Sequence, residues 1–147
     1  MFIDRIKDVR HVMEENEVEA LLLSVGADLP YFTGYEAMPL ERLTMLVLPR
    51  EGQAKLIVPA LEAPRVQERP EIFSLRPWKE SEDPIAILVE ELGASRSVAM
   101  GDTTWTRFTI ELLNQLPNLR LSRANSITSI IRSKKSPDEI KRLKKAA

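Results

Sequence analysis

Residues 20–26 of the chain, Ala20-Leu21-Leu22-Leu23-Ser24-Val25-Gly26, are the stretch that decides its fold. A short run of consecutive apolar residues is typical of a strand buried on both faces, such as a central strand in a sheet covered by helices. Gly26 ends this run and marks the exit from the predicted strand. The segments on either side of residues 20–26 must therefore supply the neighbouring strands and the covering helices.

The segment before this strand predicts an amphipathic helix over residues 2–16. Its apolar residues recur at helical spacing, at Phe2, Ile6, Val9 and Met13. His11 lies on the opposite side of such a helix, so we expect His11 to face water.

The segment after the strand predicts further strands and helices in alternation. Strands are expected at 43–48, 54–58, 72–75, 97–100 and 119–121, the first two joined as a hairpin through a turn that contains Gly52. Helices are expected at 84–92, at 105–116, around 127–131 and from Pro137, with a shorter one at 59–69 that Pro64 interrupts. Asp83 or Ser81 can cap the helix that begins at Pro84. The sequence therefore predicts an α/β fold with a mixed, mostly central sheet of about five to six strands covered by helices.

Composition limits the classes of function that the chain can have. Its 147 residues are 44% hydrophobic and 29% charged, as expected for one ordinary globular domain. The sequence has no Cys and a single His, which excludes disulfides, thiolate metal sites, cysteine nucleophiles and any multi-histidine metal site. The longest apolar run is too short to span a bilayer, so we expect a soluble, cytoplasmic protein with no membrane partner.

The charge of the chain is unevenly distributed. Residues 132–147 contain seven basic and two acidic residues, a net charge of +5, and residues 1–131 carry −6. A basic terminal segment can bind nucleic acid. This segment has no aromatic residue for base stacking, and its charges surround an ordered apolar stripe. We therefore interpret it as a solvated helix face and expect no nucleic-acid partner.

Residues 28–35, Asp28-Leu29-Pro30-Tyr31-Phe32-Thr33-Gly34-Tyr35, are the densest group of informative residues. Asp28 can cap a one-turn helix, and Gly34 permits a left-handed exit from it. The three aromatic side chains then pack near one turn, either as plugs of the core or as the lining of a pocket or partner surface. The core interpretation is favoured by the residues alone. Asp28, Glu36 and Glu41 could reach a hard cation such as magnesium, but nothing in their spacing requires one.

Two stretches together resemble the N-terminal domain of the creatinase/prolidase/aminopeptidase P family, metallopeptidases with a pita-bread catalytic domain. The first family motif, N-x-x-Y-L-T-G-[FY], is matched by Asp28, Tyr31, Phe32, Thr33, Gly34 and Tyr35, with Asp in place of Asn and Phe in place of Leu. The second, R-x-x-K-[ST]-x-x-E-[IL] followed by a basic helix with Ala, is matched by Arg132, Lys135, Ser136, Glu139, Ile140, Leu143, Lys144 and Ala146. The resemblance spans essentially the whole chain.

The resemblance implies a creatinase N-terminal domain with a ribonuclease-H-like fold at residues 1–131. Residues 132–147 would be the junction and first helix leading to an absent catalytic domain. In the family, two Asp, one His and two Glu of that catalytic domain bind two divalent ions, usually manganese, cobalt or zinc. This chain is therefore expected to have no catalytic residue, no metal site and no peptidase activity of its own.

The resemblance also implies a role for this domain. It would contribute to dimerisation of a Xaa-Pro peptidase and wall the entrance of its active site, so the expected partners are its own catalytic domain and a second copy. The candidates for that wall are Tyr31, Phe32, Tyr35 and Trp78, the last placed in a predicted loop after Arg76-Pro77. The alternatives are a stand-alone binding or regulatory module and the nucleic-acid binder described above. A dipeptidase, an aminopeptidase and a creatinase-like parent all remain compatible with the residues.

Overall fold

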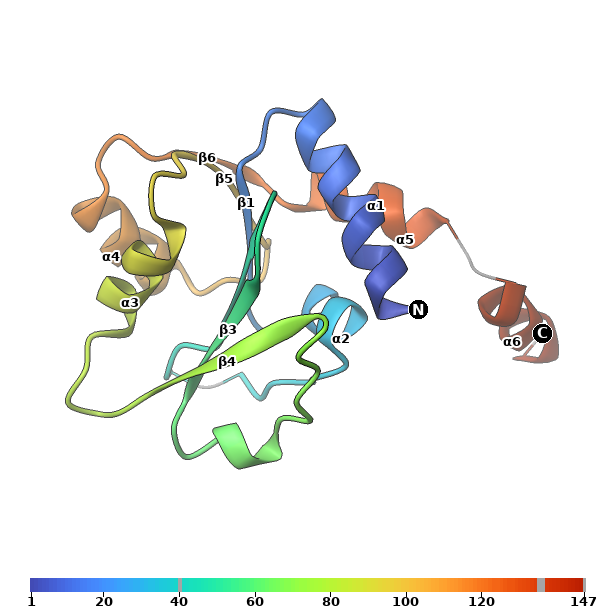
Figure 1. The fold of residues 1–147 in the computed structure, drawn as a ribbon, viewed down its shortest axis with the longest axis horizontal. Helices are drawn as coiled ribbons and strands as arrows, with labels where there is room; N and C mark the ends of the chain where they lie inside the picture. The colour runs from blue at the N-terminus through green and yellow to red at the C-terminus, as the bar shows by residue number, and fades with distance from the viewer. Residues whose placement is uncertain (40, 135–136, 147) are drawn as a thin grey trace.

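The central sheet dominates the computed structural model, which describes residues 1–39, 41–134 and 137–146 (Figure 1). Within these residues six strands lie in the order β4-β3-β2-β1-β5-β6. The strands are β1 (Ala20–Leu23), β2 (Met45–Pro49), β3 (Ala54–Pro59), β4 (Phe73–Trp78), β5 (Ser97–Met100) and β6 (Arg120–Arg123). The α/β fold with a mixed sheet is confirmed.

Strand β1 lies inside the sheet, as its apolar sequence predicts. It pairs antiparallel with β2 and parallel with β5, so that Leu22 lies opposite both Val47 and Met100. All four β1 residues are buried. The predicted hairpin joins β2 to β3, and parallel pairing adds β4 at one edge and β6 at the other.

Helices cover both faces of this sheet. Figure 1 shows α1 (Phe2–Glu15), α2 (Asp28–Thr33) and α5 (Asn125–Ser133) on one side, and α3 (Pro84–Leu92) and α4 (Thr106–Gln115) on the other. The helix α6 (Pro137–Ala146) stands at the C-terminal end, beyond α5. No helix in the described part of the chain is long and apolar enough to cross a membrane.

The alternation of side chains along the strands creates two apolar cores. Leu21 and Leu23 pack with α1, α2 and α5, whereas Ala20 and Leu22 pack with α3 and α4. Successive residues of a strand point to opposite faces, so one buried strand serves both cores. We call these the α1 core and the α3 core.

Local signals at the helix ends are largely confirmed. Asp83 accepts a hydrogen bond from the backbone N–H of Ile85 at 2.9 Å, and Pro84 opens α3. His11 is exposed on α1, where its Nε2 lies 2.7 Å from Glu15 Oε1. Lys135 and Ser136 of the second motif lie outside the described residues.

Two predicted boundaries were wrong. Strand β4 runs on through Arg76 and Pro77 to Trp78, where the sequence predicted a loop. Pro77 is tolerated because β4 is an edge strand, in which a missing backbone donor breaks no central ladder. The predicted helix at 59–69 is a single 3-10 turn at Ala63–Arg65, since the prolines of this segment leave little room for continuous helical bonding.

Candidate functional site

The aromatic segment after β1 forms α2 and a tight exit turn. Gly34 has φ of 77°, and its N–H donates to Pro30 O at 2.8 Å. A Cβ at this position would lie 3.0–3.2 Å from the Arg69 guanidinium and the Phe2 ring, so glycine is required by both conformation and space. Thr33 supports the turn, because its hydroxyl donates to Leu29 O and accepts from Tyr35 N.

Phe32 is a core residue. Its side chain is fully buried in the α1 core and meets the Tyr31 ring edge-on, with ring centroids 5.0 Å apart. An aromatic plug of this kind stabilises the domain by burying a large apolar area. Phe32 therefore has no surface with which to wall an active site.

Tyr35 is half-buried at the rim of the α1 core. Burial raises the pKa of its hydroxyl, and the negative charge of Glu62 raises it further, while Arg65 opposes both. Met38 and Leu61 carry exposed apolar side chains, at 57% and 75%, and each lies within a few residues along the chain of Tyr35 or of Glu62. Met38 Sδ lies 4.0 Å from Arg65 Nη1, and Leu61 directly precedes Glu62. We call Tyr35, Met38, Leu61 and Arg65 the Tyr35 patch.

Tyr31 is turned toward α1 and α5 rather than toward the Tyr35 patch. The Arg5 guanidinium lies 3.9 Å from the centre of its ring and donates to Tyr31 O at 2.7 Å. Its own hydroxyl lies 3.4 Å from Ile131 O, on α5. Burial raises the pKa of this hydroxyl, an effect that the positive charge of Arg5 opposes.

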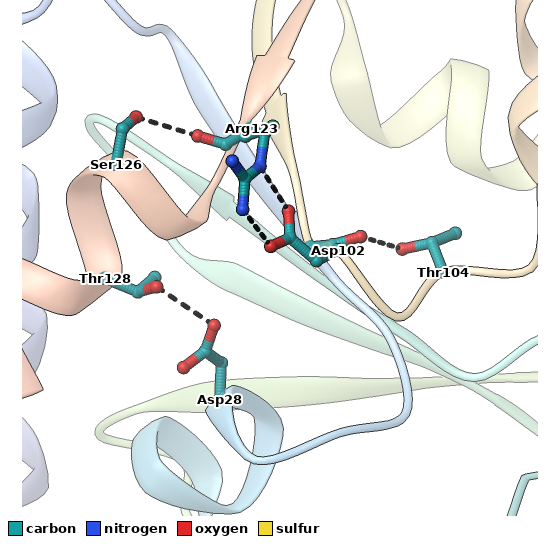
Figure 2. Close-up of polar contacts among 7 residues, drawn as sticks. Asp28, Asp102, Thr104, Arg123, Ser126 and Thr128 are labelled. Carbon is teal, nitrogen blue, oxygen red and sulfur yellow. Dashed lines mark hydrogen bonds and ion pairs between the residues drawn. The ribbon is translucent and has the colours of Figure 1, made fainter.

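Asp28 does not cap α2, which corrects the sequence prediction. The residue at the cap position is Ala27, and Asp28 begins the helix. Its carboxylate instead accepts from Thr128 Oγ1 at 3.0 Å, drawn in Figure 2, and from Arg132 Nη1 at 3.1 Å. The buried Thr128 hydroxyl and the Arg132 guanidinium are donors that only the folded chain brings close, so the local sequence could not reveal them.

Trp78 lies on the other face of the sheet, in the α3 core, with only 6% of its surface exposed. Its indole N–H donates to Leu43 O at 2.8 Å. It contributes to one wall of a cavity of about 740 Å³ whose other lining residues include Arg42, Phe108 and several carboxylates. The structure thus places Tyr31, Phe32 and Tyr35 in or against the α1 core and Trp78 in the α3 core.

A second polar group lies at the carboxyl ends of β5 and β6 and was missed by sequence reasoning. Arg123 makes two bonds to Asp102, at 3.0 and 2.6 Å, which lower the pKa of that carboxyl (Figure 2). Asp102 also borders a small cavity of about 170 Å³ between the ends of β1 and β5, together with Asp28 and Arg132. Asp28 and Asp102 are each paired with an arginine, an arrangement that suits holding neighbouring segments together. Asp102 follows β5, and Arg123 is the last residue of β6. Their positions at the ends of two parallel strands are the signal that could have revealed this pair.

The described residues contain no group of three or more His, Asp or Glu side chains arranged to hold a metal ion. Asp28, Glu36 and Glu41 therefore do not form such a group in this part of the chain. Asp28 is engaged with α5 as described above.

Comparison with known proteins connects this geometry to a family. The family model described as "Creatinase/Prolidase N-terminal domain" matches residues 5–134 of this chain. An uncharacterized peptidase of Staphylococcus epidermidis is 24% identical over 143 residues, which is 97% of this chain and 40% of that protein. The chain thus spans about two fifths of the length of the curated relatives it matches.

Solved structures give the same result. A prolidase from Thermococcus sibiricus superposes with a TM-score of 0.88 at 26% identity, over 100% of this chain and 41% of that chain. A dipeptidase from Mycobacterium ulcerans gives 0.84 at 26% identity, over 95% and 38%. The creatinase/prolidase N-terminal domain of an X-Pro dipeptidase from Streptococcus pyogenes shares the fold at a TM-score of 0.70 and 18% identity, over 89% and 98%. With 130 consecutive residues matched, this chain belongs to the creatinase/prolidase N-terminal domain family.

Proposed function

We propose that this chain is the non-catalytic N-terminal domain of a cytoplasmic Xaa-Pro metallopeptidase, either a prolidase or an aminopeptidase P. The support is its likeness along its whole length to a prolidase of which it covers only 41%. The remaining part of the parent would hold two divalent ions, manganese, cobalt or zinc. Such ions activate a water molecule for attack on the peptide bond before proline.

Within that parent, we assign the domain a part in dimerisation and in walling the active-site entrance. The observation that carries this role is the Tyr35 patch, which contains the exposed side chains of Met38 and Leu61, a half-buried tyrosine and an arginine. Tyr, Met and Arg are enriched at protein interfaces relative to the rest of the surface. Of the four aromatic candidates, Tyr35 is the one that belongs to this patch, because Phe32 and Trp78 are buried and Tyr31 faces α1 and α5.

The test uses the parent protein with manganese and a Xaa-Pro dipeptide, with proline release and molar mass in solution as readouts. The wild-type parent is expected to hydrolyse the peptide as a dimer. Leu61→Asp places a charge on the Tyr35 patch and is expected to shift the dimer toward monomer or to raise KM. Because Leu61 is 75% exposed, the change should not unfold the domain.

Ile110→Asp is the matched control, since Ile110 is 53% exposed but lies on α4, over the opposite face of the sheet. It should leave mass and KM unchanged. A parent without activity toward Xaa-Pro peptides would overturn the proposed reaction. A Leu61→Asp protein that behaves like Ile110→Asp would overturn the role of the Tyr35 patch.

A further inference from the structure

The aromatic motif at residues 28–35 and the basic motif that begins at Arg132 are far apart in the sequence but lie against each other in the folded chain. Arg5 on α1 contacts both: its Nη1 donates to Tyr31 O at 2.7 Å, and its Nη2 donates to Glu139 Oε1 at 2.7 Å. Arg5 and Glu139 are separated by 134 positions along the chain. One guanidinium therefore joins the aromatic helix α2 to the junction helix α6.

Arg5 is well placed for this task. Its side chain is only 14% exposed, and that of Glu139 is 24% exposed. The planar guanidinium also lies over the Tyr31 ring at 3.9 Å and 5.6 Å from the centre of the Phe2 ring. Stacking fixes the plane of the group, so that its two donor directions point at fixed positions. A charge-assisted bond that is shielded from water is also stronger than an exposed ion pair.

A second set of contacts holds α2 against α5 and includes Arg132, the first residue of the proposed junction. Asp28 accepts from Thr128 and from Arg132, over 100 and 104 positions. The Tyr31 hydroxyl lies 3.4 Å from Ile131 O. The start of the junction at Arg132 is therefore anchored to the same short helix that Arg5 holds.

Apolar packing contributes little to the position of α6. Its two large apolar side chains are exposed, Ile140 at 42% and Leu143 at 57%. A helix without a buried apolar stripe depends on polar contacts for its orientation. The Arg5–Glu139 bond ties α6 to α1.

We propose that Arg5, Tyr31 and Glu139 form a clamp that sets the direction of α6 relative to α2, with Arg5 as its positioning residue. On the proposed function, in which a catalytic domain follows α6, the clamp also sets where α2 and the Tyr35 patch lie relative to that domain. The clamp itself is a property of this chain and can be tested without any catalytic readout.

The first test measures the orientation of α6 in the chain by the distance between two nitroxide labels. The sequence has no Cys, so Asn114→Cys on α4 and Lys144→Cys on α6 provide two unique labelling sites. Both positions are exposed, and the helices α4 and α6 that carry them lie far apart in Figure 1. The wild-type clamp is expected to give one narrow distance distribution.

Glu139→Ala removes the acceptor on α6 and leaves the contacts of Arg5 with Tyr31 in place. The width of the distribution is then expected to rise roughly twofold, because α6 samples more orientations. Arg5→Lys keeps the charge but lacks the planar fork, so it is expected to broaden the distribution as well. Glu15→Ala, which removes an exposed carboxylate paired with His11 on α1, is the control and should leave the width unchanged. A Glu139→Ala distribution as narrow as the control overturns the clamp.

The second test uses the parent protein. Glu139→Ala is expected to raise KM for a Xaa-Pro peptide several-fold with a smaller effect on kcat, since the entrance is displaced and the metal ligands are not. Equal KM values for Glu139→Ala and Glu15→Ala would overturn the effect of the clamp on the entrance. A wild-type parent without peptidase activity overturns the proposed function, and the label distances then decide the clamp alone.

Discussion

Burial separates aromatic side chains that look alike in the sequence. Phe32 and Tyr35 lie three positions apart, yet Phe32 is fully enclosed by the α1 core and Tyr35 lies at its rim. The exit turn at Gly34 causes this difference, because the left-handed conformation there redirects the chain before Tyr35. The two residues should therefore respond differently to the same substitution.

Phe32→Ala is expected to lower the free energy of unfolding by about 3–5 kcal/mol, since it leaves a cavity in a closed core. Tyr35→Ala should cost about half of that or less, because part of its ring is already in contact with water. Urea denaturation of the two variants measures both values. Equal losses would mean that Tyr35 is as much a core residue as Phe32, and would remove it from the proposed interface.

Gly26, in the loop that follows β1, is expected to be the most constrained of the turn glycines. Its φ is +146°, and an added Cβ would clash with Thr103 Oγ1. Gly52 also has a positive φ, of +96°, but nothing lies within 4 Å of an added Cβ. Both Ala variants meet backbone strain, and only Gly26→Ala meets a neighbour as well.

Thermal unfolding of the two Ala variants tests this distinction. Gly26→Ala should lose more stability than Gly52→Ala by about 1 kcal/mol or more, because a close non-bonded contact adds to the strain. Similar melting temperatures for the two variants would show that Thr103 moves aside at no cost.

Where the pairing of β1 with β5 begins, one carboxylate accepts hydrogen bonds from the neighbouring backbone. Glu19 Oε1 accepts from the backbone N–H groups of Arg96 and Ser97, each at 3.1 Å. The bond from Arg96 and then the bond from Ser97 lower the pKa of this carboxyl. A carboxyl whose pKa is lower in the folded state stabilises the fold above its unfolded-state pKa, and this contribution is lost as pH falls through the folded-state pKa.

Glu19→Gln keeps an acceptor oxygen at this position and removes the titration. The wild type is expected to be more stable than the variant near neutral pH, and the difference should shrink as the pH falls below the ordinary range of a glutamate carboxyl. Urea unfolding at several pH values measures the difference. Two parallel curves over that range would show that the charge of Glu19 does not contribute to stability.

Helices and strands with strong local signals were predictable from the sequence. The apolar run of β1 and the cap and proline at the start of α3 each determine their element from adjacent residues. Contacts over long sequence separations were not predictable. Asp28 has the sequence of a helix cap but binds Thr128 and Arg132, and β4 extends to Trp78 because pairing with β3 outweighs the local effect of Pro77.

The aromatic candidate site was likewise predictable only in part. Its membership, Tyr31, Phe32 and Tyr35 on one turn, follows from their spacing. Their roles depend on partners from distant segments, Arg5 for Tyr31 and the exposed Met38 and Leu61 for Tyr35. The Asp102–Arg123 pair required knowledge that β5 and β6 lie side by side.

For the chain as a whole, two apolar cores on the faces of one sheet are expected to be sufficient for folding. The melting temperature of the purified chain should therefore change by less than about 1 °C when EDTA is added. EDTA would lower it further only by removing an ion that binds and stabilises the folded state. Differential scanning calorimetry with and without EDTA measures this. A fall of several degrees would reveal a structural ion.

We propose that this domain belongs to a Xaa-Pro peptidase whose catalytic residues lie in the rest of that protein. The most direct measurement is the rate of proline release from a Xaa-Pro dipeptide with manganese, for the purified chain and for its parent side by side. We expect steady turnover by the parent and a rate for the chain equal to that of buffer, because activation of water requires bound metal ions, which we propose lie in the rest of the parent. Turnover that follows the isolated chain through successive purification steps would contradict it.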